Sequence, residues 1–98
     1  MTDAEINLAI AKIEYPNDSW SMTHGDGVAR VAGQDLIVKD YCNNWSDIGP
    51  IIDREKIDLT YLGYYKVWLA ANQDDSNKEQ AETPTKAAAL CYLKMKGE

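Results

Sequence analysis

The sequence DYCNNWSD, residues 40–47, lies between a predicted strand and a predicted helix and combines a thiol, two amides, an indole, a hydroxyl and two carboxylates. Such a set can form a reactive site, or it can start a helix. Ile48, Ile51 and Ile52 follow at helical spacing, which predicts a helix directly after the stretch. Asn, Ser and Asp are preferred at helix N-termini, so we interpret the stretch chiefly as a helix start.

Pro50 constrains where that helix begins, because proline has no N–H and fits only the first turn without loss. With Asp47 as the N-cap, Pro50 is the third helical residue and no hydrogen bond is lost. With Asn44 as the N-cap, Asp47 serves as its capping partner and Pro50 falls inside the helix, where it introduces a kink. The sequence leaves both starts open.

The N-terminal region also predicts a helix. Thr2 and Glu5 have the spacing of a capping box. Apolar side chains then recur at helical spacing at Ile6, Ala9, Ile10 and Ile13. Pro16 ends this helix near Tyr15. Residues 16–27 contain Pro, Asn, Asp, Ser and Gly, and we expect them to form a loop.

Two hairpins are predicted on either side of the central helix. Residues 28–31 and 36–39 are rich in branched side chains and are separated by a Gly-Gln-Asp turn. Residues 57–61 and 64–71 form the second pair of strands, joined at a Leu-Gly step. Both pairs are therefore expected to be antiparallel.

The C-terminal region predicts a polar loop followed by a helix. Residues 72–83 (NQDDSNKEQAET) are expected to form a mobile loop. Thr83 and Pro84 then open the last helix as N-cap and first helical residue, and Gly97 closes it. The side chains expected on its buried side are Ala87, Leu90, Cys91 and Met95.

The element order is therefore α-β-β-α-β-β-α over residues 1–98, which we expect to form a single domain. Helices and antiparallel hairpins are most readily combined as layers around one core. The predicted fold is α+β, with a small antiparallel sheet of about four strands packed with three helices as an α/β sandwich.

Composition excludes several function classes. The chain has 98 residues with 10 Lys and Arg against 16 Asp and Glu, a net charge of −6. A nucleic-acid binder needs a basic patch, and the basic residues here are scattered, so direct binding to nucleic acid is not expected. The acidic residues are scattered too, whereas a DNA mimic needs longer acidic rows. The sequence shows neither a long apolar run nor a signal peptide, so we expect a cytoplasmic protein without a membrane span.

Cys42 and Cys91 lack the spacing of a zinc site, and the chain has a single histidine, His24. A nucleophilic Cys42 would need a base and an orienting group, and the sequence places no base beside it. A small enzyme, or enzyme subunit, built on the junction of residues 42–47 stays open as an alternative. We expect both thiols to be buried and reduced.

Two loops have the composition of ligand sites. His24 begins the sequence HGDG, whose glycines could cradle an anion, but the Lys-Ser or Lys-Thr of a phosphate-binding loop does not follow. Asp75, Asn77 and Glu79 alternate as in a calcium loop, but the positions that require Gly and Glu hold Gln and Lys. We therefore expect ordinary turns, with no metal and no cofactor.

Aromatic residues must supply the bulky part of the core, because Phe is absent and the chain has three Trp and six Tyr. Tyr61, Tyr64, Tyr65 and Trp68 gather in the second predicted hairpin, where alternation would put Tyr64 and Trp68 on one face. Aromatic strands can stack bases or receive a peptide. Since no basic groove lies beside them, we favour the core for this group.

Three blocks of sequence carry a resemblance to a known family. They are MTDAEIN at residues 1–7, YCNNW running through IGPII at 41–52, and Trp68-x-Ala70 followed by TPTKAAALCYLKM at 83–95. In this order they resemble small uncharacterised proteins of tailed phages and prophages, of the NinX-like, phage α-β-α sandwich type. The resemblance implies an α/β sandwich encoded by a phage or prophage and working in the bacterial cytoplasm, and it implies no reaction. The Arg usual before the final apolar run is Lys86 here, which puts a shared basic contact in doubt.

We therefore expect a small accessory phage protein that acts by protein–protein contact, for example on a host factor, rather than an enzyme. An acidic DNA-mimic inhibitor is a further alternative, and a homodimer stays open. The residues proposed for surface contact are Tyr41, Asn43, Asn44, Trp45, Asp47 and Trp68.

Overall fold

The computed structural model describes residues 1–21, 27–31 and 34–97, and only the backbone of residues 34–38. The predicted α+β class is confirmed. The helices are α1 (Asp3–Glu14), α2 (Trp45–Glu55) and α3 (Pro84–Met95). One antiparallel sheet contains β1 (Trp20–Ser21), β2 (Ala29–Val31) and β3 (Gln34–Lys39). The other contains β4 (Asp58–Leu62), β5 (Val67–Ala71) and β6 (Lys78–Ala81).

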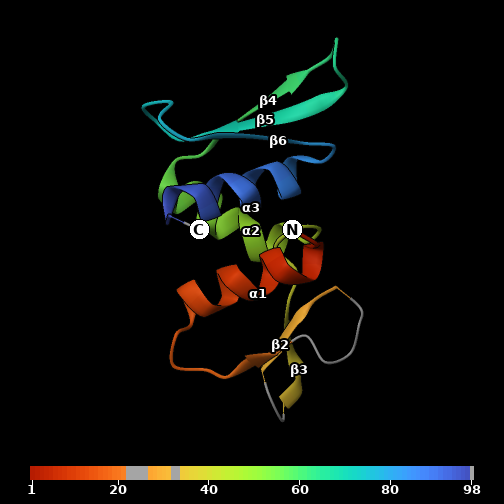
Figure 1. Cartoon of the computed structure of the whole chain (residues 1–98), viewed down its shortest axis with the longest axis vertical. Coiled ribbons are helices and arrows are strands. Elements are labelled where there is room, and N and C mark those ends of the chain that lie inside the picture. Colours follow the sequence, from red (N-terminus) through yellow and green to blue (C-terminus); the bar gives the residue numbers. More distant parts are fainter. Residues whose placement is uncertain (22–26, 32–33, 98) are drawn as a thin grey trace.

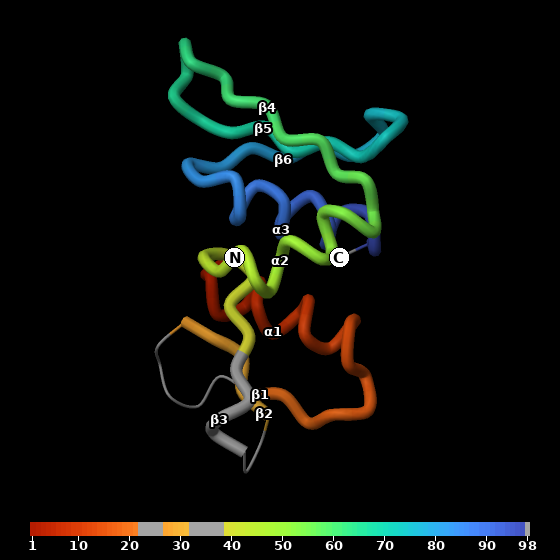
Figure 2. The backbone as a smooth tube through the Cα atoms, turned by 180° about the vertical axis from the view of Figure 1, so that it is seen from behind, coloured from red at the N-terminus to blue at the C-terminus, as the bar shows by residue number. Residues whose placement is uncertain are grey.

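The helices lie between the two sheets (Figure 1). The β4-β5-β6 sheet covers α3 at one end of the molecule, and the β1-β2-β3 sheet packs beside α1 at the other, an arrangement that Figure 2 shows from behind. The molecule is elongated along this stacking direction, measuring 43 × 23 × 21 Å. The fold is thus a sandwich with helices inside, where the sequence predicted one sheet of about four strands.

β6 lies within residues 72–83, which were predicted to form a loop. It pairs antiparallel with β5, with Trp68 opposite Ala81 and Ala71 opposite Lys78. A tight turn precedes it, in which the Asn72 N–H donates to the Asn77 carbonyl at 3.1 Å. Lys, Glu and Gln have low strand propensity, but the open edge of β5 supplies a partner ladder that outweighs it.

β1 is likewise a strand inside a predicted loop. Trp20 pairs with Val31 of β2 and is 8% exposed, so burial of its indole fixes this short segment. The predicted antiparallel pairing in this sheet is confirmed, since β2 and β3 pair with a shift in register after Arg30. Gln34 and Asp35, which were predicted to lie in the turn, belong to β3 instead. His24 and its glycines lie outside the described residues.

The second predicted hairpin is also confirmed, with Asp58 opposite Ala71 and Leu62 opposite Val67. Its turn spans residues 63–66, so Tyr64 lies in the turn and does not share a strand face with Trp68. The hairpin extends beyond the end of α3 in Figure 1.

Both terminal helices begin as the sequence predicted. The Thr2 hydroxyl accepts from the Glu5 N–H at 3.2 Å, and the Glu5 carboxylate accepts from the Thr2 N–H at 2.9 Å, which completes the capping box. In α3, the Thr83 hydroxyl accepts from the Lys86 N–H at 3.3 Å. No described helix has the length and apolar character needed to cross a membrane.

The buried side of α3 is wider than predicted, because the helix touches the β4-β5-β6 sheet on one side and α1 and α2 on the other. Leu90 and Met95, both predicted to be buried, are only half-buried. Small side chains let the neighbouring layers approach closely. The buried residues are Thr85, Ala87, Ala88, Ala89, Cys91, Tyr92 and Leu93.

Candidate functional site

The junction between β3 and α2 settles the start of the central helix. Asn44 is the N-cap, with extended backbone angles and a side-chain oxygen that accepts from the Ser46 N–H at 2.8 Å. The helix therefore begins at Trp45, and Pro50 lies inside it. Pro50 offers no N–H to the Ser46 carbonyl, but both residues are exposed, so water can bind that oxygen. Of the two starts left open by the sequence, the structure has the one at Asn44.

With Asn44 as the N-cap, the sequence predicted that Asp47 would act as its capping partner. The structure gives Asp47 a different role. Its carboxylate accepts from the Asp40 N–H at 2.9 Å and lies 3.6 Å from the Lys39 ammonium. The contact spans the turn between strand and helix, so Asp47 ties α2 back to the end of β3. The side chain is 14% exposed, which makes it part of the packed junction and not of an open site.

Two buried polar side chains hold the junction in place. Asn7 of α1 is fully buried; its oxygen accepts from the Cys42 N–H at 3.1 Å, and its amide donates to the Gly27 carbonyl and the Asp40 carboxylate. Thr85 of α3 donates its hydroxyl to the Cys42 carbonyl at 2.6 Å. Both backbone groups of Cys42 thus bond to helices far away in sequence. These hydrogen bonds satisfy backbone groups that are buried in a loop and have no neighbouring strand to bond with.

The Cys42 thiol is fully buried behind this junction. Burial raises its pKa to about 12, with the Asp3 and Asp40 carboxylates adding to the effect. A nucleophilic cysteine needs a lowered pKa and an adjacent base, and Cys42 has the opposite environment. Its burial and raised pKa therefore argue against Cys42 as a nucleophile.

The proposed contact residues divide between the interior and the surface. Tyr41 is only 2% exposed, so the prediction that it lies on the contact surface is wrong. Asn43 is exposed and donates to Asp40 and Asp3, and Asn44 is exposed beside it. Trp45 is 53% exposed at the first position of α2. The junction thus brings together all of the candidates except Trp68, which lies on β5.

The aromatic group of the second hairpin is not the core that the sequence favoured. Tyr61, Tyr64 and Tyr65 are 52%, 91% and 69% exposed, and Trp68 is half-buried. The rings of Tyr61 and Trp68 lie 5.2 Å apart between their centres. The large aromatic side chains of the core are Trp20, Tyr41 and Tyr92 instead.

A groove of about 510 Å³ opens between the N-terminal ends of α1 and α3 and the end of β6. Asn43 lines it from the junction, and Ala81 lines it from β6, directly opposite Trp68 on the neighbouring strand. Glu82 and Leu90 supply an exposed carboxylate and a half-buried apolar side chain. The groove therefore combines two apolar side chains, Ala81 and Leu90, with a mostly polar and charged lining.

Two of the charged side chains that line the groove neutralise each other. The Lys86 ammonium lies 2.9 Å from the Asp3 carboxylate. Their hydrogen bond lowers the pKa of Asp3 and raises that of Lys86, so both stay charged at neutral pH. Glu82 is the remaining charged residue of the lining, which gives the mouth of the groove a net negative charge.

The family model described as bacteriophage P22, NinX matches residues 1–96. The chain belongs to this family. The match covers all three sequence blocks that suggested the resemblance, so the resemblance to the NinX family is confirmed. Neither a curated protein nor a solved structure matches the chain.

Within this NinX-family chain, Lys86 replaces the Arg that the sequence analysis expected. The structure shows its ammonium bound to Asp3, an ion pair that joins the start of α3 to the start of α1. The compact ammonium of Lys makes this contact to one oxygen of the Asp3 carboxylate.

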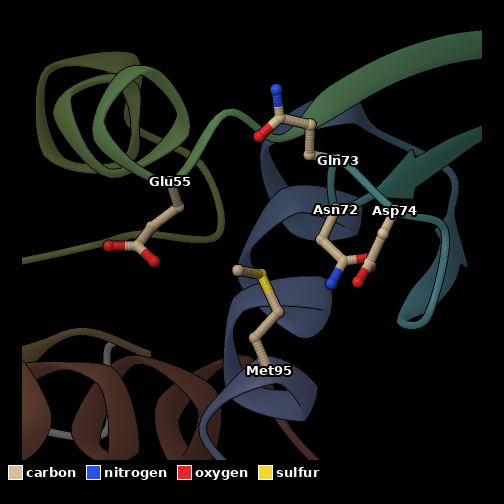
Figure 3. A pocket seen from close by; sticks show the side chains of 5 residues that line it. All are labelled: Glu55, Asn72, Gln73, Asp74 and Met95. Atoms are coloured by element: carbon tan, nitrogen blue, oxygen red, sulfur yellow. The ribbon is translucent and has the colours of Figure 1, made fainter.

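A second hollow of the NinX-family chain, of about 360 Å³, lies between the end of α2 and the turn before β6 (Figure 3). Met95 points into it from α3, while the Glu55 carboxylate turns away from Met95. Two of its polar residues are engaged within the turn, since Asn72 accepts from the Asn77 N–H and Asp74 accepts from the Ser76 N–H. The Glu55 carboxylate accepts from Arg54.

Cap replacements should separate the two roles in the junction. We expect Asn44→Ala to lower the free energy of unfolding by roughly 0.5–2 kcal/mol, the range for a lost N-cap. Asp47→Ala should lower it by roughly 1–3 kcal/mol, because the Asp40 N–H then lacks its acceptor. Urea denaturation measures both, with the exposed Asp53→Ala on the same helix as control. A loss confined to Asp47→Ala would contradict the capping role of Asn44.

Proposed function

We propose that this NinX-family chain is a small accessory protein of a phage or prophage that binds another protein in the bacterial cytoplasm. The observation that carries the proposal is the groove of about 510 Å³, whose lining combines the apolar Ala81 and Leu90 with polar and charged side chains. Surfaces of this composition suit a protein partner, since aromatic and aliphatic anchors with a polar rim are what interfaces use.

The lining of the groove suggests the chemistry of its occupant. Ala81 and Leu90 suit an apolar side chain, and Glu82 at the mouth suits a basic group beside it. The Asp3–Lys86 pair can exchange hydrogen bonds with the backbone of a bound segment. A short segment that presents one apolar and one basic side chain therefore fits this surface.

The charge distribution speaks against the DNA-mimic alternative. Among the described residues, five carboxylates lie within salt-bridge distance of Lys or Arg: Asp3, Glu14, Asp47, Glu55 and Glu79. Paired carboxylates do not form the continuous acidic rows that imitate a phosphate backbone. The net charge of −6 is therefore spread over a surface of mixed sign.

A pair of charge reversals tests the groove. The tagged chain is used to capture its partner from bacterial cells, and the captured protein is then titrated against purified variants. Glu82→Lys should weaken binding by about tenfold, because a basic group of the partner then meets an ammonium. Asp53→Lys changes the net charge equally on the exposed side of α2 and should leave binding unchanged. Equal weakening by both variants, or by neither, would contradict a partner site in the groove.

A further inference from the structure

β4 is an outer strand whose edge lacks the usual protection. It pairs with β5 on one side, and the described residues provide no strand on the other. The other outer strands are shorter or carry more charge: β1 has two residues, β6 carries Lys78 and Glu79, and β3 carries Asp35 and Lys39. β4 has five residues, DLTYL, with one charge and no proline. Long uncharged edges favour pairing with a further strand.

We propose that β4 pairs antiparallel with β4 of a second copy of this chain, about a twofold axis at Thr60. In this register Thr60 faces Thr60, Leu59 faces Tyr61, and Asp58 faces Leu62 of the other copy. All five residues pair, and no charge meets a like charge. A register centred on Asp58 would instead place two carboxylates opposite each other. The chemistry of β4 is thus complementary to itself, and two three-stranded sheets join into one of six strands.

This pairing would bury part of the aromatic surface that is exposed in the single chain. Tyr61 is 52% exposed and would lie across from Leu59 of the second copy, on the face that packs toward the core. Beyond the strand, the turn with Tyr64 and Tyr65 would run beside the end of α2 of the second copy, where Lys56 is exposed. An ammonium over a tyrosine ring is a favourable contact. The pairing thus accounts for why the hairpin extends past α3 uncovered (Figure 1).

Net charge predicts how the dimer responds to salt. Each copy carries a charge of −6, so two copies repel each other at a distance. Salt screens this repulsion, whereas backbone hydrogen bonds and apolar contacts at β4 remain. The dimer should therefore become tighter as the salt concentration rises, the reverse of an interface held by opposite charges.

Sedimentation equilibrium of the full chain tests the proposal. We expect a mass of twice the 11.0 kDa of one chain, with association strengthened by added salt. Thr60→Lys should weaken association by about tenfold or more, because two ammonium groups then meet at the axis. Gln80→Lys is the matched control, since Thr60 and Gln80 both flank Leu69 in the same cross-strand row, on opposite edges. It should leave the dimer intact.

A mixing experiment keeps the test informative if Thr60→Lys is poorly folded alone. Thr60→Asp and Thr60→Lys should each be monomeric, and an equal mixture should form a dimer containing one copy of each. A wild-type chain that stays monomeric at all salt concentrations would overturn the proposal, as would weakening by Gln80→Lys equal to that by Thr60→Lys. The groove lies on the β6 side, so capture of a partner there and pairing at β4 can fail separately.

Discussion

Replacing Asn7 with alanine should lower the free energy of unfolding by roughly 2–5 kcal/mol. The side chain is fully buried and bonds to Cys42, Gly27 and Asp40 at 3.1, 2.6 and 2.9 Å. Its loss leaves the Cys42 N–H buried without this acceptor. The Gly27 carbonyl and the Asp40 carboxylate each lose a donor, although Asn43 still donates to Asp40. Each unsatisfied group costs about 1–3 kcal/mol, and the cavity adds to this.

Urea denaturation followed by tryptophan fluorescence measures the Asn7 effect. Asn17→Ala, at an exposed asparagine, is the matched control and should change stability by less than about 0.5 kcal/mol. Asn7→Asp keeps the size of the side chain but turns a carboxylate oxygen toward Asp40, so it should also be strongly destabilising. If Asn7→Ala is as stable as the control, the junction is not held by this residue.

Replacing Glu14 with alanine should be the second large effect, at roughly 2–4 kcal/mol. Glu14 of α1 accepts two hydrogen bonds from Arg54 of α2, both at 2.9 Å, and a short one from the hydroxyl of Tyr92 of α3. Arg54 is half exposed, so the ion pair itself contributes little. Tyr92 is 1% exposed, so its hydroxyl would lose its acceptor inside the core.

The same network predicts a pH dependence. The hydrogen bond from Arg54 holds the pKa of Glu14 below its ordinary value of about 4.5, and Tyr92 adds to the effect against the cost of burial. A lowered folded pKa stabilises the protein above the unfolded value, and this stabilisation is lost as the pH falls through the folded value. Wild type should therefore lose more stability than Glu14→Ala between neutral pH and the range below about 4.5. Parallel acid profiles for the two proteins would contradict the network, and exposed Glu82→Ala should follow wild type.

The sequence predicted the helices well because their signals are local. Thr2 with Glu5, and Thr83 with Pro84, define the starts of α1 and α3 within a few residues of chain. The start of α2 stayed open between Asn44 and Asp47. In the structure Asn44 caps the helix, while Asp47 is drawn to the end of β3 by contacts that depend on the tertiary fold.

Strands and surface were harder to predict because their signals are not local. β6 exists because β5 offers it an edge, not because its own residues favour a strand. The exposed tyrosines of the second hairpin were assigned to the core because the chain lacks Phe and because the sequence shows no basic groove beside them. Their hairpin extends beyond α3, which no count of aromatic residues reveals.

Asn7 was missed, although the sequence holds a signal for it. It lies three and four residues before Ile10 and Ala11, both fully buried, and so belongs to the same face of α1. An amide on the apolar face of a helix needs a buried partner. In this chain the partner is the turn before α2, which connects the first helix to the stretch where the fold changes from strand to helix.

Alkylation of the native thiols tests most directly whether residues 40–47 are a folding junction or a reactive site. Cys42 and Cys91 are both fully buried, and burial raises the pKa of each thiol, to about 12 for Cys42. At neutral pH both should react slowly, at a rate set by unfolding, and both should become fast together in urea. Fast labelling of Cys42 in the folded protein, with Cys91 still slow, would show that the junction opens to solvent and would contradict the account.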